Sequence, residues 1–175
     1  MDTSRSLLLE GDHTTGSKAA SVVLVEYGDY ECPFCRRDQP GLERLLAQQS
    51  ERVCFAFRHF PITAEHPNAE RAARAAEAAD LQGRFWPMHE QLMHRDGALD
   101  DAALAACAEA AGLSLERLWA DIERPDVARR VERDVELGRR DGVAGTPWYL
   151  LDGVRTGPLA ALAKALRGGP GHPAR

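Results

Sequence analysis

Two cysteines, Cys32 and Cys35, lie three positions apart, with Pro33 and Phe34 between them. An apolar run over 22–27 precedes them, and a run with leucines at helical spacing follows. A C-x-x-C pair of this kind is half of a metal site, a structural clip, or a pair of thiols that exchanges disulfides. These possibilities differ in what must surround the two sulfur atoms.

The local sequence favours redox chemistry, because proline is preferred at the first position of a helix and Pro33 then opens one. Cys32 would be the N-cap, facing unsatisfied backbone N–H groups and the positive end of the helix dipole. Both features stabilise a thiolate, and cysteines at such sites have pKa values of about 3.5–7.5. We therefore expect Cys32 to be an accessible nucleophile and Cys35 the more buried resolving thiol.

The metal and clip interpretations have less support. Zinc needs four ligands, but there is no second C-x-x-C pair, and the five-residue step from His89 to His94 does not match the H-E-x-x-H spacing. A structural disulfide would close a very small loop and add little stability. We expect no metal and no organic cofactor, and we place Cys54 and Cys107 in the core.

An acidic residue interrupts the apolar run before the cysteines. Glu26 lies among valines and a leucine, where an ionised carboxylate is costly to bury. Strand alternation would place its side chain at the surface. A buried carboxylate would instead have a raised pKa and could accept the proton of Cys35 when that thiol attacks. The sequence leaves both interpretations open.

A proline also stands before a late apolar strand. Thr146 and Pro147 precede it, and a proline is tolerated at the start of a strand. An ordinary trans peptide is one interpretation. A cis peptide is the other, and it would leave the Thr146 backbone free to pair with an extended peptide. Trp148 could border the same groove.

The remaining histidines and arginines near these segments have no assigned function. We expect His59 and His66 to be plain polar residues on loops. Arg36 and Arg37 follow the cysteines and are expected on a solvated face, where they would add at most some positive potential.

Hydrophobic periodicity places these residues in an α/β arrangement. The expected elements are a short edge strand over 6–10, strands over 21–27 and 52–60 joined by a helix over 33–49, helices between 67 and 141, a hairpin over 145–157 that turns at Asp152 and Gly153, and a last helix opening at Pro158. Because an isolated hairpin is not stable, the helical block is inserted within one sheet. We predict a sheet domain over 1–62 and 142–175, and an inserted helical subdomain over 63–141.

Composition is that of an ordinary globular domain, with 175 residues, 44% hydrophobic and 28% charged. The net charge of -5 argues against nucleic acid as a partner. The first residues, MDTSRSLLLEGDH, do not resemble a signal peptide, and no apolar run is long enough to cross a membrane. We expect a cytoplasmic monomer.

With these parts placed, the chain resembles the DsbA-like branch of the thioredoxin superfamily. The resemblance rests on VEYGDYECPFC over 25–35, FRHFP over 57–61, GVAGTPWYLLDG over 142–153, and the helical block between the two halves of the sheet. It implies a thioredoxin-like fold with an inserted all-helical subdomain. It also implies a protein disulfide oxidoreductase that acts on protein or peptide thiols and disulfides, with glutathione as a further small-thiol partner.

The resemblance implies specific roles. Cys32 matches the nucleophile, Cys35 the resolving cysteine and Glu26 the buried acid. Pro147 matches the cis-proline, and the expected substrate-binding residues are Pro33, Phe34, Thr146, Pro147 and Trp148. The family's best-known periplasmic oxidants have histidine where this chain has Phe34, so we expect a less oxidising pair. A strong oxidant of secreted proteins would also be out of place in a reducing cytosol.

Other functions stay open. The same residues serve oxidation, reduction or isomerisation, and a glutathione-linked reductase uses the same chemistry. A non-enzymatic module could use the cis-proline groove to bind extended peptides, and a zinc-binding module is a further alternative.

Overall fold

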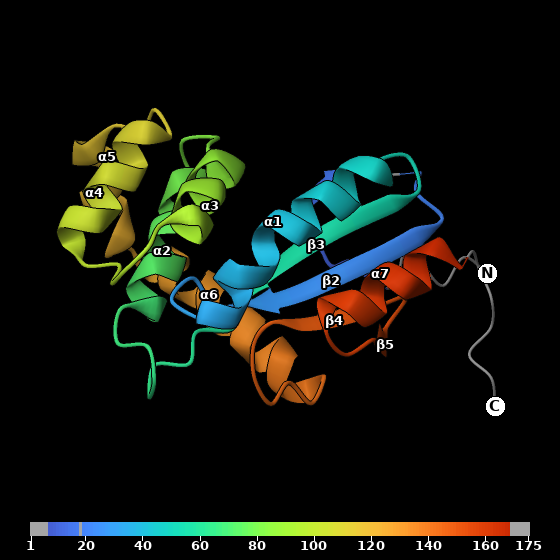
Figure 1. Cartoon of the computed structure of the whole chain (residues 1–175). Coiled ribbons are helices and arrows are strands. Elements are labelled where there is room, and N and C mark those ends of the chain that lie inside the picture. Colours follow the sequence, from blue (N-terminus) through green and yellow to red (C-terminus); the bar gives the residue numbers. More distant parts are fainter. Residues whose placement is uncertain (1–6, 18, 169–175) are drawn as a thin grey trace. The chain divides into compact units, whose positions relative to one another are not determined.

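The computed structural model describes residues 7–17 and 19–168 (Figure 1). The elements in chain order are β1 (His13–Gly16), β2 (Val22–Gly28), α1 (Pro33–Gln48), β3 (Val53–His59), α2 (Ala69–Asp80), α3 (Phe85–His94), α4 (Asp101–Ala110), α5 (Leu115–Ile122), α6 (Pro125–Arg140), β4 (Trp148–Leu151), β5 (Val154–Arg155) and α7 (Leu159–Arg167). Among the described residues, no helix combines the length and the apolar character that a bilayer span requires.

One sheet contains all five strands, in the order β1-β3-β2-β4-β5. Every residue of β2 and β3 is buried, which explains why both strands read as near-continuous apolar runs. The predicted strand, helix and strand before residue 60 are therefore confirmed as β2, α1 and β3.

The edge of the sheet differs from the prediction. Residues 7–10 form no strand, so the edge strand expected over 6–10 is wrong for the described part of that segment. The edge strand is β1, with the sequence HTTG, antiparallel to β3 from His13 opposite Phe57 to Gly16 opposite Cys54. An edge strand that is only partly covered does not need the apolar pattern that marks a buried strand.

The predicted hairpin is confirmed as β4 and β5. Asp152 and Gly153 have φ values of 49° and 80°, the left-handed pair that a two-residue hairpin turn requires. The turn is also tied to β2, because the Asp152 backbone N–H donates to the Val23 carbonyl at 2.8 Å and its Oδ1 accepts from the Val23 N–H at 2.9 Å. Gly153 therefore serves the turn and Asp152 serves both the turn and the sheet.

Internal contacts divide the described chain into two compact units. The first contains the residues up to 26, 40–57 and those from 148 onward, and the second contains 27–39 and 58–147. The cysteine pair belongs to the second unit with the helices α2 to α6. The domain boundaries predicted at residues 62 and 142 stay a prediction.

Helix α2 is the centre of the second unit and contacts α3, α4, α5 and α6. Its buried side chains are mostly alanine, which lets several helices approach it closely. The predicted N-cap of α4 is confirmed, since the Asp100 side chain accepts from the Ala103 N–H at 2.9 Å. Gly83 and Gly112 follow their helices with φ values of 68° and 74°, as predicted for helix ends.

A buried polar cluster within the second unit surrounds His59, the last residue of β3. His59 Nε2 lies 2.8 Å from Glu77 Oε1, and the His59 N–H donates to Asp134 Oδ2 at 3.0 Å. Arg130 pairs with the other Asp134 oxygen at 2.5 Å. The expectation that His59 is a polar loop residue is therefore wrong. It ends a buried strand, where polar groups must find partners.

We expect Gly138→Ala to destabilise the second unit. A Cβ at Gly138 would lie 2.5 Å from Phe60 Cδ2 and 3.2 Å from Tyr27 Cδ1, within a packed aromatic contact. Overpacking of this kind costs about 1–3 kcal/mol, more than the roughly 1 kcal/mol by which alanine favours a helix. Urea denaturation should show a net loss in the free energy of unfolding. Gly145→Ala, where no atom lies within 4 Å, is the matched control, and equal stabilities of the two variants would contradict this packing account.

Candidate active site

The cysteine pair lies at the start of α1, as predicted. The Cys32 carbonyl accepts the helical hydrogen bond of the Arg36 N–H at 3.1 Å, and the Cys32 N–H donates to the Asp29 carbonyl at 3.1 Å. Cys32 is therefore the residue before the first helical position, Pro33. Both Cys32 and Cys35 are free thiols, so the structure describes the dithiol form.

The surroundings of Cys32 lower its pKa to about 5. The hydrogen bond from the Cys35 thiol is the largest cause, and burial opposes it. The Thr146 side chain and the backbone N–H groups of Cys35 and Phe34 add further stabilisation of the thiolate. These donors are fixed by the start of the helix, so the anion is stabilised without rearrangement.

Cys32 is more enclosed than expected. The residue is only 3% exposed and Cys35 only 1%, so the prediction of a readily accessible nucleophile is wrong for this dithiol form. Phe34, between them, has 55% of its surface exposed. Within residues 32–35, Pro33 and Phe34 are thus the exposed residues, and the two cysteines are buried.

The Thr146–Pro147 peptide is cis, which decides between the two interpretations of this dipeptide. The loop brings Thr146 next to Cys32, a residue 114 positions away, and the Cys32 thiol donates to the Thr146 carbonyl at 3.2 Å. The buried Thr146 hydroxyl has no hydrogen-bond partner among the described residues, so it is available to a thiolate. Trp148 begins β4, and the Arg155 guanidinium lies 3.6 Å from the centre of its ring system.

Glu26 is a buried residue of β2, with 1% exposure. The interpretation that strand alternation places it at the surface is therefore wrong. Its function as proton acceptor for Cys35 stays a prediction.

An acid–histidine pair that the sequence did not single out lies beside Cys32. Asp29 is 1% exposed, and its Oδ2 accepts from the Ile62 N–H at 2.8 Å and from His66 Nδ1 at 2.7 Å. Its Oδ1 accepts from the Glu31 N–H at 2.8 Å. His66 lies on a loop, as expected, but a buried carboxylate three residues before Cys32 holds its ring, so the expectation of a residue without a specific interaction is wrong.

Glu31, the residue just before Cys32, fixes the same loop from the other side. Its carboxylate accepts from the Asn68 backbone N–H at 2.8 Å, from the Asn68 side chain at 3.0 Å and from the Leu99 N–H at 2.8 Å. Burial opposes ionisation, but these hydrogen bonds and the charge of Arg36 outweigh it and lower the pKa of Glu31. The loop before Cys32 is thus anchored to two segments of the helical unit.

The two arginines after the pair differ in their surroundings. Arg36 donates to the Tyr30 carbonyl and to the Gly97 carbonyl, both at 2.7 Å, so the prediction of a solvated side chain is wrong for it. Arg37 is exposed as predicted, and its guanidinium lies 5.2 Å from the centre of the Phe34 ring.

Comparison with known proteins places the chain in a family. The profile of the DSBA-like thioredoxin domain matches residues 23–167. The chain belongs to the DSBA-like thioredoxin domain family. A solved thioredoxin-like oxidoreductase from Silicibacter pomeroyi DSS-3 is 28% identical, with a TM-score of 0.80 over 95% of this chain and 97% of that one. The thiol-disulfide exchange protein alpha-DsbA2 from Wolbachia pipientis shares the fold, at 20% identity and a TM-score of 0.79 over 95% of this chain and 90% of that one. The predicted thioredoxin-like α/β fold is confirmed.

Curated relatives of this DSBA-like domain have a different name. The Na(+)/H(+) antiporter NhaA 1 of Salinispora arenicola is 40% identical over 144 residues, which cover 82% of this chain and 22% of that protein. The protein of the same name from Mycolicibacterium gilvum is 40% identical over 168 residues, covering 93% of this chain and 27% of that protein. The chain thus spans about a quarter of the length of these relatives.

The other two cysteines of the DSBA-like domain are buried core residues, as predicted. Cys54 lies in β3 and Cys107 in α4. Burial is the largest influence on Cys107 and raises the pKa of its thiol. The hydrogen bond and charge of Arg95 and the charge of Arg36 favour the Cys107 thiolate, but burial outweighs them.

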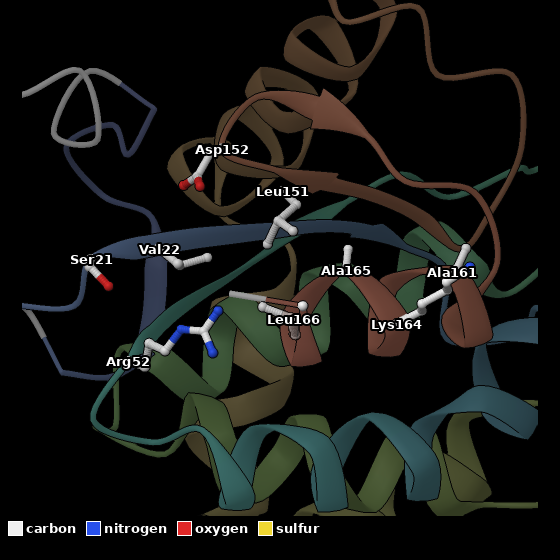
Figure 2. A pocket seen from close by; sticks show the side chains of 10 residues that line it. Ser21, Val22, Arg52, Leu151, Asp152, Ala161, Lys164, Ala165 and Leu166 are labelled. Carbon is white, nitrogen blue, oxygen red and sulfur yellow. The ribbon is translucent and has the colours of Figure 1, made fainter. Parts of the chain in front are cut away.

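A hollow of about 500 Å³ in the first unit contains none of the predicted site residues (Figure 2). It lies along the start of β2, the β4–β5 turn and α7, with Arg52, Asp152 and Lys164 in its polar lining. The lining contains no cysteine and none of the residues that surround Cys32, so the hollow has no visible connection to the cysteine chemistry.

We expect Cys32 to be the most reactive thiol of the chain. Its alkylation by iodoacetamide should accelerate as pH rises, with most of the increase centred near pH 5, because the thiolate forms as pH passes the lowered pKa. At pH 6, peptide mapping should find label on Cys32 well before Cys107, whose raised pKa keeps it a thiol. Cys32→Ser is the control that removes the fast phase. Equal rates at all four cysteines would contradict the assignment.

Proposed function

We propose that this DSBA-like domain is a thiol–disulfide oxidoreductase whose nucleophile is Cys32. The observation that carries the proposal is the placement of the Cys32 thiol just before α1 and one helical turn from a second thiol, a geometry that lowers its pKa to about 5. A buried cysteine that only fills space has no need of such stabilisation, and Cys107, with its raised pKa, is the example within this chain.

The chemistry balances without a cofactor. In the reducing direction, the Cys32 thiolate attacks one sulfur of a substrate disulfide, and the other substrate sulfur leaves as a thiolate. Cys35 then loses its proton, attacks the Cys32 sulfur of the mixed disulfide and releases the second substrate thiolate. In this proposal Glu26 accepts the Cys35 proton. The oxidising direction is the same sequence in reverse.

The site also suits an extended peptide as substrate. The Thr146 carbonyl accepts a hydrogen bond from Cys32 in the dithiol form, and this bond ends when the Cys32 sulfur enters a mixed disulfide. The Thr146 backbone could then pair with the substrate backbone, while Phe34, exposed beside it, contacts substrate side chains. Pro33, Pro147 and Trp148 complete the proposed substrate-binding residues.

The low pKa of Cys32 favours oxidation as the direction. A stabilised thiolate stabilises the dithiol form, so the disulfide form becomes the stronger oxidant. The expectation that Phe34 makes the pair less oxidising stays a prediction, because other groups supply stabilisation here. The cytoplasmic location, the monomeric state and the use of glutathione also stay predictions.

Two other functions would leave different signatures. A non-enzymatic peptide-binding module predicts that Cys32→Ser retains full affinity for peptides and full biological function. A zinc-binding module predicts stoichiometric zinc in the purified protein. The antiporter activity named for the relatives is not extended to this chain, which covers 22–27% of their length.

Removing the resolving thiol should trap substrates. We expect Cys35→Ser to accumulate mixed disulfides at Cys32, because nothing intramolecular can then attack the Cys32 sulfur. Non-reducing electrophoresis of the protein purified from cells should show adducts that collapse on adding dithiothreitol. The double variant Cys32→Ser/Cys35→Ser is the control and should carry none. Absence of adducts from both variants would argue against the proposed function.

Equilibration with glutathione buffers should establish the direction. We expect the reduction potential of the pair to be less negative than that of thioredoxin, which is about −270 mV. The disulfide form should then be reduced to the dithiol in glutathione buffers that are too oxidising to reduce thioredoxin. Each tenfold change in the equilibrium constant corresponds to about 30 mV. A potential at or below that of thioredoxin would identify a reductase and contradict the oxidising assignment.

A further inference from the structure

Hydrogen-bond donors stabilise the Cys32 thiolate, and the residues between the two cysteines add no positive charge to them. Pro33 and Phe34 are uncharged. Arg36 is committed to the Tyr30 and Gly97 carbonyls. Arg37 is exposed and pairs with Asp38 at 2.9 Å.

His66 is an ionisable residue that can add a positive charge beside the loop that leads to Cys32. Its Nδ1 lies 2.7 Å from Asp29 Oδ2, and the side chain is 15% exposed. Asp29 cannot easily swing away, because the backbone N–H groups of Ile62 and Glu31 also bind its two oxygens, both at 2.8 Å. The Asp29 carbonyl accepts from the Cys32 N–H at 3.1 Å, so one residue holds both the histidine and the nucleophile.

We propose that His66, held by Asp29, is a positioning residue that places a positive charge beside the Cys32 thiolate and thereby favours the dithiol form of the pair. The proposal rests on the proposed function of Cys32. It adds a residue from the loop before α2 to a site otherwise built from the start of α1 and the Thr146–Pro147 loop.

The charges that face His66 support this assignment. Burial disfavours the imidazolium most strongly, but the hydrogen bond to Asp29 and the charges of Asp29, Cys32 and Glu65 outweigh it and raise the pKa of His66. Electrostatic coupling is reciprocal, so an imidazolium that is favoured by the Cys32 thiolate also favours that thiolate. The effect is lost as pH rises through the pKa of His66 and the ring becomes neutral.

The test is His66→Gln, which keeps a hydrogen-bond donor toward Asp29 and removes the charge. We expect the pKa of Cys32, measured by alkylation rate against pH, to rise by about half a unit to one unit, which is a roughly three- to tenfold lower thiolate fraction below that pKa. The glutathione equilibrium constant should change in parallel, toward a less oxidising disulfide. His94→Gln, at an exposed histidine at the end of α3, is the matched control and should change neither value.

A second readout separates charge from structure. The wild-type rate profile should contain a small further step above pH 6.5, where His66 loses its proton, and this step should be absent from His66→Gln. In an Asp29→Asn background, where the carboxylate no longer favours the imidazolium, the effect of His66→Gln should shrink. If Asp29→Asn does not fold, the single variant and its profile still decide.

The outcomes are distinguishable from a failure of the proposed function. A wild-type Cys32 pKa near the ordinary 8.5 would refute the thiolate nucleophile itself. If the wild-type pKa of Cys32 is near 5 and neither His66→Gln nor His94→Gln changes it, only the function proposed for His66 is refuted. Loss of stability in His66→Gln without a change in the Cys32 pKa would likewise reduce it to a structural residue.

Discussion

A thiolate held at the first turn of a helix is the constraint on which the site depends. The anion at Cys32 needs donors that are already in position, because burial alone would raise its pKa. The Cys35 thiol and the backbone N–H groups at the start of α1 supply them, and their geometry follows from the helix itself. The rest of the site holds this helix start in place and arranges access to one sulfur atom.

Two carboxylates in the loop before Cys32 connect this loop to other loops of the second unit. Asp29 binds the Ile62 N–H and His66, and Glu31 binds Asn68 and the Leu99 N–H. The backbone N–H groups of these loops are shielded from water and need hydrogen-bond acceptors, which the two carboxylates provide. The loops and the loop before Cys32 therefore fix one another's positions. Chemistry and folding thus use the same hydrogen bonds, and the electrostatic environment of the sulfur is set by segments far away in the chain.

Local patterns were sufficient for much of the architecture. The buried strands, the helix opened by Pro33, the Asp100 cap and the Asp152–Gly153 turn were all predictable, because each depends on residues a few positions apart. The edge strand β1 was not, since a half-covered strand has no strong apolar signal and the leucines before it were misleading. The only hint of the Asp29–His66 pair was an acid close before the first cysteine.

The sequence by itself determined that a pair of cysteines stands at the start of a helix, since C-P-x-C after a buried strand specifies the cap, the spacing and the helix dipole. Only the tertiary structure decided which distant groups surround it. Thr146 lies 114 positions from Cys32, and His66 lies 37 positions from Asp29. Burial, the cis peptide and a paired histidine arise where separate segments meet, and hydrogen bonds between such segments leave no periodic trace in the chain.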